Sequence, residues 1–291
     1  MDTVLESRTK SVVIGSGKPF CIIGERINPT GRKKFQEQLR AGDLSAVEKD
    51  VHAQVEGGAM VLDVNMGVPL TDEAELLSKA VKLVQSLTDL PLCIDSSVVE
   101  ALEAGLAAYE GKALVNSVTV EDERMDAILP LVKRHNAAII ALPNDETEIP
   151  IDPKRRVELA KKFVDLATSK YDIPIEDIVI DPLAMPIGAD SLHADRTMDA
   201  IAMIAQEIGV NMTLGASNVS FGMPDRHTLN AVFLPMAMRS GLTSAIMDAR
   251  TPQVVTAVKG ADLMLGNDEW GASWIQAHRA KQASEAAASE F

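Results

Sequence analysis

Short apolar segments bounded by turn residues alternate along this chain with longer segments of helical periodicity, and no other feature restricts the possible fold as strongly. This alternation is typical of parallel strands that are joined by crossover helices. A set of eight such strands favours a parallel sheet that closes into an α/β barrel. The predicted strands, mostly apolar on both faces as buried parallel strands are, cover residues 20–24, 60–64, 92–94, 114–118, 138–142, 178–180, 212–215 and 244–247.

The segments between the predicted strands carry the signals of helix ends. Apolar residues three or four apart follow Asp43, a candidate N-cap, and a pair of glycines at 57–58 ends that helix. Thr71 is predicted to open the next helix. Asp152 with a first-turn proline precedes a helical segment at 157–171. Each of these helices lies between two predicted strands, as a barrel of this kind requires.

Both ends of the chain are expected to add to the barrel. Residues 12–14 and 20–23 flank a Gly-Ser-Gly turn, which predicts an N-terminal hairpin that plugs the lower mouth of the barrel. The last stretch, 276–291, is rich in Ala, Ser, Glu and Lys and predicts a polar C-terminal helix that frays. A barrel commonly accommodates 291 residues in a single domain. We therefore expect the barrel over 1–272 and the polar tail or helix over 273–291.

The chain is acidic, with 28 basic and 42 acidic residues and a net charge of −14. Such a field repels phosphate backbones and anionic membrane surfaces, so neither nucleic acid nor a membrane is an expected partner. No signal-peptide core lies in the first twenty residues, and eighteen apolar residues nowhere run unbroken, so a cytoplasmic protein is expected. Cys21 and Cys93 each lie in an apolar strand, which indicates core thiols rather than a disulfide or a metal motif.

A carboxylate or amide side chain lies at the end of every predicted strand or just after it. Because the carboxyl ends of parallel strands share one rim, these side chains are expected to converge on one mouth, where such barrels hold their chemistry. The alternative role of any one of them is to cap the following helix or turn. They are Glu25, Asp63 with Asn65, Asp95, Asn116, Asn144, Asp181, Asn218 and Asp248.

A site of carboxylates and amides with few cations selects a ligand that presents several N–H donors in one plane, because a carboxylate accepts two parallel hydrogen bonds. The edge of a 2-amino-4-oxopteridine has this geometry. Magnesium with an oxygen-rich substrate suits the same side chains, and spacing alone does not separate the two ligands. The histidines form no close pair with one another or with a cysteine, so no local zinc site is predicted.

Several segments of the chain carry a resemblance to a known family. They read IGERINPTG at 23–31, QVEGGAMVLDVNMG at 54–67, CIDSS at 93–97, LVNSV at 114–118 and GASNVSFGMP at 215–224. Together they resemble the pterin-binding family of methyltetrahydrofolate:corrinoid methyltransferases, which includes the folate domain of cobalamin-dependent methionine synthase. The similarity extends from about Phe20 to Gly266. It implies a TIM (β/α)8 barrel, usually a homodimer, that binds methyltetrahydrofolate at its C-terminal rim and has no metal of its own.

The resemblance also implies roles for individual residues. Asp95 in IDSS, Asn116 in VNSV and Asp181 in VIDPL match the residues that hydrogen-bond the pterin ring. Asn218 in GASNVS matches the residue placed near N5, where it would stabilise the changing charge as the catalytic residue. The further matches are Gly215 and Ser217 of the same loop, the rim glutamate Glu25 and Arg226 after the loop, while Asp63, Asn65 and Asp248 are expected to be scaffold.

The implied reaction transfers the N5-methyl group between methyltetrahydrofolate and the cobalt of a corrinoid such as cobalamin. The chain lacks the D-x-H-x-x-G signature of corrinoid binding, because Asp50 and His52 have the first spacing but Val55 stands where glycine is needed. A separate corrinoid protein that docks transiently at the barrel mouth is therefore implied.

Three alternatives stay open at this point. A dihydropteroate synthase has the same fold and pterin grip, but GASNVSFGMP lacks the lysine-containing S-R-K-S run expected of that family. A non-catalytic folate-binding protein would keep the ring contacts without any need for a contact at N5. A magnesium-dependent barrel lyase would lose its activity on chelation.

Overall fold

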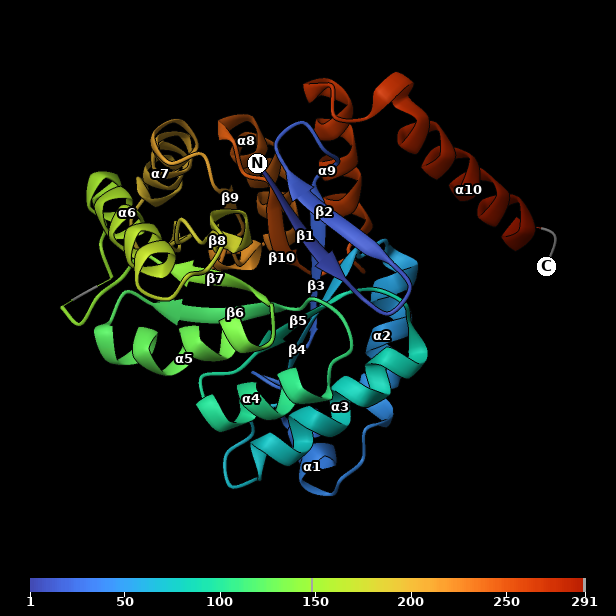
Figure 1. Cartoon of the computed structure of the whole chain (residues 1–291). Coiled ribbons are helices and arrows are strands. Elements are labelled where there is room, and N and C mark those ends of the chain that lie inside the picture. Colours follow the sequence, from blue (N-terminus) through green and yellow to red (C-terminus); the bar gives the residue numbers. More distant parts are fainter. Residues whose placement is uncertain (148, 290–291) are drawn as a thin grey trace.

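The computed structural model describes residues 1–147 and 149–289, and its centre is an eight-stranded parallel sheet that curls into a barrel with helices around it (Figure 1). The strands follow one another in the order β10-β3-β4-β5-β6-β7-β8-β9, so each strand from β3 to β8 pairs with the next one along the chain, and β10 pairs with β3. The predicted TIM-type barrel is thereby confirmed. Its strands are β3 (Cys21–Ile27), β4 (Val61–Asn65), β5 (Leu92–Asp95), β6 (Leu114–Thr119), β7 (Ala138–Leu142), β8 (Ile178–Ile180), β9 (Asn211–Met212) and β10 (Ser244–Met247).

The barrel closes between its last two strands through an irregular seam. The strand predicted at 212–215 is shorter in the structure, because only its first part pairs with β8. Across the seam, Ser244 Oγ donates to Met212 O at 2.9 Å, so a side-chain hydroxyl takes the place of a backbone N–H donor there. Ile246 N donates to Leu214 O at 2.9 Å one step further on. After these bonds the backbone leaves the sheet and enters the loop that contains Gly215 and Asn218, which line the mouth of the barrel.

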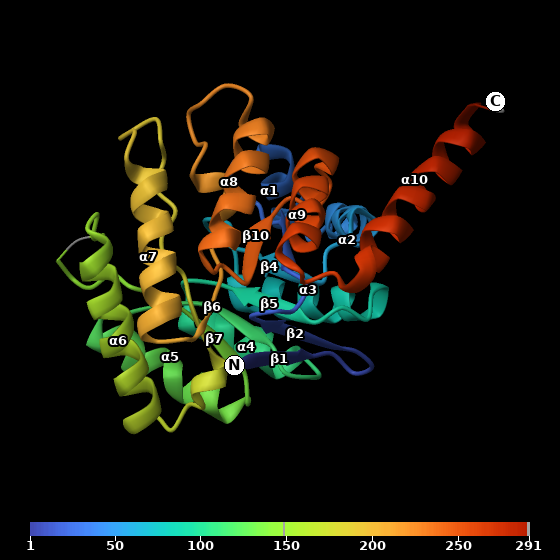
Figure 2. The same cartoon turned by 90° about the horizontal axis from the view of Figure 1, so that it is seen from above.

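A helix follows each strand on the outside of the barrel, with two after β3 and one further helix at the C-terminus (Figures 1 and 2). Apolar residues of the helices pack on the outer face of the sheet and form the larger of two hydrophobic clusters. The helices are α1 (Lys33–Arg40), α2 (Ser45–Gly57), α3 (Glu73–Leu87), α4 (Val99–Ala108), α5 (Asp122–Arg134), α6 (Pro153–Ser169), α7 (His193–Glu207), α8 (Arg226–Ser240), α9 (Pro252–Leu265) and α10 (Ala272–Ser289), with short 3₁₀ helices η1 (Ile175–Asp177), η2 (Ala216–Asn218) and η3 (Glu269–Gly271).

Two of the three predicted helix starts lie one residue away from the N-cap in the structure. The N-cap of α3 is Asp72, whose carboxylate accepts from a backbone N–H of the first turn, whereas the hydroxyl of Thr71 donates back into the preceding loop. The N-cap position of α2 is Leu44, and the carboxylate of Asp43 bonds a backbone N–H two residues on. The cap of α6 at Asp152 is confirmed.

The N-terminal hairpin differs from the predicted one in the segment that pairs with residues 12–14. It pairs β1 (Asp2–Glu6) with β2 (Ser11–Gly15) in antiparallel register. Residues 20–23, which were predicted to be its second strand, start the barrel instead, because β3 is held between β10 and β4 on both of its edges. The Gly-Ser-Gly turn is therefore the link from the hairpin into the barrel.

The predicted location of the hairpin is confirmed. Leu5 and Ile14 pack with inward-facing barrel residues such as Ile23, Cys93 and Val179 in the second hydrophobic cluster. Val61 and Leu114 of the same cluster are the first residues of β4 and β6, so the hairpin closes the end of the barrel opposite to the carboxyl ends of the strands. It lies in front of the barrel in Figure 1. Both cysteines are buried and free, as the sequence predicts.

Leu5→Ala is expected to destabilise the protein by ~3 kcal/mol, because it leaves a cavity where the hairpin meets the barrel interior and Leu5 is 0% exposed. Denaturant unfolding measures the change. Met264→Ala, at a position that is 86% exposed on α9, is the matched control and should alter stability by less than about 0.5 kcal/mol. Equal unfolding midpoints for Leu5→Ala and the unmodified protein would contradict the packing described here.

The C-terminal helix α10 extends away from the barrel in both views (Figures 1 and 2). The predicted polar helix is therefore present over Ala272–Ser289, and the last two residues of the predicted stretch, 290–291, lie outside the described part of the chain. No helix within the described residues is both long enough and apolar enough to span a bilayer.

Candidate functional site

A cavity of about 390 Å³ opens at the carboxyl ends of the barrel strands. Among the described residues, every barrel strand except β7 contributes to its wall, either from its last residues or from the loop that follows. The wall is predominantly polar and contains four carboxyl groups. The lining residues are Glu25, Arg26, Asn28, Thr30, Asp63, Asp95, Asn116, Asp181, Gly215, Asn218 and Ile246.

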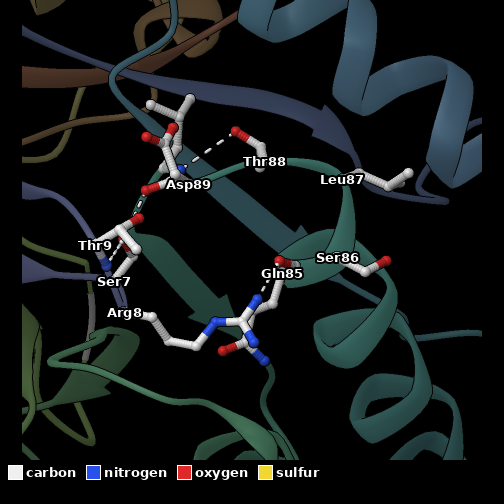
Figure 3. A pocket seen from close by; sticks show the side chains of 9 residues that line it. Ser7, Arg8, Thr9, Gln85, Ser86, Leu87, Thr88 and Asp89 are labelled. Atoms are coloured by element: carbon white, nitrogen blue, oxygen red, sulfur yellow. Dashed lines mark hydrogen bonds between the residues drawn. The ribbon is translucent and has the colours of Figure 1, made fainter.

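A second and larger hollow, of about 590 Å³, lies at the hairpin turn beside the connection from α3 to β5 (Figure 3). Its polar groups already bond one another: Ser7 Oγ donates to Asp89 O at 2.6 Å and Arg8 donates to Gln85 O at 2.9 Å. No cluster of carboxyl groups lines it within the described chain. The cavity at the strand ends is therefore the candidate site, although it is smaller.

Two amide–carboxylate pairs form one side of the candidate site. Asn65 Nδ2 donates to Asp95 Oδ2 at 2.9 Å, and Asn116 Nδ2 donates to Asp63 Oδ1 at 3.1 Å. The first pair joins the neighbouring strands β4 and β5, whereas the second reaches from β6 to β4 across the end of β5, which lies between them. The pairs hold Asp95 and Asn116 in place while leaving part of each side chain facing the cavity.

Asp181 follows β8 directly, and a buried arginine holds the turn after it. Asp181 Oδ1 accepts a hydrogen bond from Leu183 N at 2.8 Å. Arg156 of α6, which is 0% exposed, donates to the carbonyl oxygens of Pro182 and Leu183, at 2.8 Å each. The carboxyl group of Asp181 is thus placed by a turn that is fixed from both sides.

The loop after β9 carries Asn218 at the cavity mouth. Asn218 is solvent-exposed, and its side chain makes no hydrogen bond within the part of the chain that the structure describes. A Cβ on Gly215 would lie 2.9 Å from Asn218 Nδ2, so glycine at this position leaves room for the amide. The amide is free to donate or to accept toward a ligand in the cavity.

Comparison with known proteins identifies the family of this chain. Residues 24–248 match the family described as pterin binding enzymes. The chain belongs to the pterin-binding enzyme family.

Relatives in this family cover most of the chain. A methylcorrinoid:tetrahydrofolate methyltransferase of Eubacterium limosum is 33% identical over 266 residues, which are 89% of this chain and 96% of the relative. The methionine synthase of Mycobacterium tuberculosis is 33% identical over 241 residues, 78% of this chain but only 20% of that protein. The first relative therefore has nearly the same extent as this chain, whereas the second is much longer.

Solved structures of dihydropteroate synthases have the same fold. The enzyme of Xanthomonas albilineans superimposes with a TM-score of 0.68 at 17% identity, over 91% of this chain and 98% of that one. The enzyme of Vibrio fischeri gives a TM-score of 0.66 at 16% identity, over 90% and 98%. At these identities the likeness shows the shared fold of pterin-binding enzymes and nothing finer.

Burial gives the carboxyl groups of this pterin-binding enzyme unusual pKa values. Desolvation raises the pKa of Asp181 to about 7, against the opposing effects of the Leu183 N–H and the Arg156 charge. Desolvation also raises the pKa of Asp95 to about 6, opposed by the hydrogen bond from Asn65. The pKa of Asp63 lies well above its ordinary value, because the group is buried and Asp95 is nearby. The site therefore holds carboxyl groups that change protonation near neutral pH.

Three strand-end residues that were predicted to converge on the mouth do not line the cavity. The side chain of Asn65 bonds Asp95 from behind, as described above. Burial raises the pKa of Asp248, but hydrogen bonds from Arg250 and Gln54 outweigh that effect and hold it at about 2. Asn144 makes backbone hydrogen bonds in its loop. The side chains of Asn65 and Asp248 are therefore engaged by other residues of the chain, whereas that of Asn144 makes no hydrogen bond among the described residues.

Ser217 and Arg226 lie next to the cavity rather than in its wall. Ser217 Oγ donates to Glu25 Oε1 at 2.9 Å, and Arg226 donates to Ser217 O at 2.6 Å. Arg226 thus ties the start of α8 to the loop that carries Asn218. Burial raises the pKa of Glu25, against the hydrogen bond from Ser217. The three residues form a support behind the mouth.

Asp63 was expected to be scaffold, yet it lines the cavity, although it is only 2% exposed. Sequence reasoning also missed the cavity residues Arg26, Asn28 and Thr30, which all belong to the IGERINPTG segment. Their presence in that segment was the available signal. In an ordinary strand, Glu25 and Arg26 would face opposite sides, but the pairing register of β3 and β4 shifts between residues 24 and 27.

Within the described residues, no group of three or more His, Cys, Asp or Glu side chains is arranged to hold a metal ion.

Proposed function

We propose that this protein transfers the N5-methyl group between methyltetrahydrofolate and the cobalt of a corrinoid carried by a separate protein. The observation that carries the proposal is the meeting of Asp95, Asn116, Asp181 and Asn218 in one cavity at the barrel mouth. The relative from Eubacterium limosum, which this chain spans almost completely, supports the same chemistry through its name.

The carboxyl groups suit the edge of a pterin ring. Asp95 and Asp181 would accept hydrogen bonds from the ring's N–H groups, and Asn116 would offer its free amide oxygen or its second N–H. The two carboxyl groups lie on β5 and after β8, with β6 and β7 between these strands, so they would contact the ring at two separate points. A ring held in this way has one orientation, which fixes the direction of the N5-methyl bond.

Asn218 would act at N5. Transfer of the methyl group changes the charge on N5, and a hydrogen-bonding group already placed there stabilises that change without reorganisation. The amide of Asn218 serves either protonation state of N5, because it has both a donor and an acceptor.

The corrinoid supplies a cobalt centre that accepts or donates the methyl group. Its carrier protein would dock over the cavity mouth, and the acidic surface of this chain would tune that encounter. The homodimer implied by the family resemblance stays a prediction, which size-exclusion chromatography with light scattering would test.

An absorbance assay tests the proposed reaction. Methyltetrahydrofolate and free cobalt(I) cobalamin are mixed with the protein, and methylcobalamin formation is followed along with the reverse reaction. The proposal predicts conversion in at least one direction, insensitive to chelators. No conversion in either direction would refute it, and condensation of a dihydropterin pyrophosphate with p-aminobenzoate would instead favour a dihydropteroate synthase.

Pterin binding is expected to strengthen as pH rises from ~5.5 to ~8.5, because ionised carboxylates accept hydrogen bonds better than neutral ones. The pKa values of about 6 for Asp95 and about 7 for Asp181 place the transition in this range. Titrations of tetrahydrofolate into the protein across this range measure it.

Asp181→Asn is the control for this pH dependence. It should remove the upper part of the transition, near pH 7, and leave the lower part that belongs to Asp95. An affinity that stays constant across the whole range in the unmodified protein would contradict the assignment of these carboxyl groups to the ring.

A further inference from the structure

Arg26 is the one cationic residue in the cavity wall, among the residues that the structure describes. It follows Glu25 in β3, and the register shift beside β4 brings both side chains to the mouth. Asn28 and Thr30, from the same connection to α1, line the wall beside it. One side of the cavity is therefore cationic and polar, whereas the other sides carry carboxyl groups.

Arg26 has no partner within the described chain. Its side chain makes no hydrogen bond or ion pair there, and its Nε atom is buried without an acceptor. Two neighbouring arginines differ from it in this respect. Arg32 donates to Asp50 at 2.6 Å, and Arg250 donates to Asp248 at 2.6 Å.

Glu25 does not satisfy Arg26, although the two are adjacent in the chain. Glu25 Oε1 accepts a hydrogen bond from Ser217. Within the described part of the chain, Glu25 and Arg26 form no ion pair, so no Glu25 oxygen lies within 4.0 Å of the guanidinium. A half-buried guanidinium without an acceptor is unfavourable, because desolvation of a charge is offset only by pairing. Burial and the two nearby arginines accordingly lower the pKa of Arg26. An anion at this point of the wall would relieve both effects.

A reduced folate brings such an anion. Its pterin ring carries no negative charge that could pair with Arg26. Its p-aminobenzoyl tail, however, ends in glutamate carboxylates. In a chain of net charge −14, these carboxylates would be repelled at most places on the surface. The guanidinium of Arg26 offers a fork of donors that matches a carboxylate.

We propose that Arg26 is a specificity-determining residue that binds a glutamate carboxylate of the folate tail, and that it makes the site prefer a complete folate to a bare pterin. This inference rests on the proposed function, since it takes the cavity as the folate site. The ring would lie against Asp95 and Asp181, and the tail would leave the cavity along the wall of Arg26, Asn28 and Thr30.

Isothermal titration calorimetry without any corrinoid tests the proposal with two ligands, tetrahydrofolate and 6-methyltetrahydropterin, which has no tail. The unmodified protein should bind tetrahydrofolate roughly tenfold to a hundredfold more tightly than the tail-less pterin. Arg26→Gln should weaken tetrahydrofolate by that factor and leave 6-methyltetrahydropterin unchanged. Arg26→Lys, which keeps the charge but loses the fork, should fall between them.

Arg250→Gln is the matched control, because Arg250 is also an arginine near the rim but is already paired with Asp248 and does not line the cavity. It should leave the ratio of the two affinities as it is. Circular dichroism melting curves show whether each variant folds.

Two results would overturn the inference while leaving the proposed methyl transfer standing. One is an unchanged affinity of Arg26→Gln for tetrahydrofolate. The other is an equal loss of affinity for tetrahydrofolate and for 6-methyltetrahydropterin, which would mean that Arg26 contacts the ring or supports the fold of the site. If the unmodified protein bound neither ligand, the proposed function would fail together with the inference.

Discussion

Asn218→Ala is expected to slow single-turnover methyl transfer to or from cobalt by about 10²–10³-fold, the usual cost of losing one placed donor at a site of charge development. Asn218 lies at the cavity mouth with its amide unbonded within the described chain, so its removal leaves no orphaned protein partner. The affinity for tetrahydrofolate should therefore fall much less than the rate. Rapid-mixing absorbance measurements with saturating methyltetrahydrofolate separate the two quantities.

Asn144→Ala is the matched control for this experiment. Asn144 is also an amide that follows a barrel strand, but it does not line the cavity. Its replacement should leave the transfer rate within about twofold of the unmodified protein, as is usual for side chains away from special sites. A single-turnover rate for Asn218→Ala that matched this control would remove Asn218 from the mechanism.

Asp181→Asn is expected to weaken tetrahydrofolate binding by about a hundredfold at pH 8, because it replaces an ionised acceptor of paired hydrogen bonds by a neutral amide. The same change should stabilise the unliganded protein at that pH. A carboxyl group whose folded pKa, about 7, exceeds its unfolded value favours folding fully at low pH and loses that contribution as pH rises through 7. Removing the ionisable group removes this loss.

Chemical denaturation at pH 5 and pH 8 measures the effect on stability. We expect Asp181→Asn to raise the free energy of unfolding by about 1–2 kcal/mol at pH 8 and by less at pH 5, since the half-buried group keeps some contact with water. Such a gain would mean that the Asp181 carboxylate lowers the stability of the unliganded protein and is retained because it binds the ligand.

Asp248→Asn provides a contrast of opposite sign. Hydrogen bonds from Arg250 and Gln54 hold the pKa of Asp248 at about 2, so its contribution to stability is present above the unfolded pKa and is lost in acid. Its replacement should lower stability at both pH values and leave ligand affinity nearly unchanged. If Asp181→Asn and Asp248→Asn shifted stability in the same direction, burial would not be the cause of the raised pKa of Asp181.

Much of the barrel was predictable because its signals are local. Strands such as Ala138–Leu142 and Ser244–Met247 are continuous apolar runs between turn residues, and the structure has them at the predicted positions. The motif segments likewise placed Asp95, Asn116, Asp181 and Asn218 at strand ends, and the structure brings all four into one cavity. Local sequence also predicted that a hairpin precedes the barrel.

Contacts between remote segments decided the rest. Residues 11–15 pair with residues 2–6 rather than with 20–23, because β10 and β4 occupy both edges of β3. Among the polar strand ends, Asp248 turns to Arg250 and Gln54, whereas Asp63 faces the cavity.

The amino-acid sequence by itself determined the family, the order of the strands and the residue types at the mouth, since periodicity and motif spacing are properties of neighbouring residues. Only the tertiary structure decided which of those side chains stay free for a ligand. That choice depends on hydrogen-bond partners supplied from distant parts of the chain and on a register shift against β4, which turns Arg26 into the cavity and leaves it there without an acceptor among the described residues.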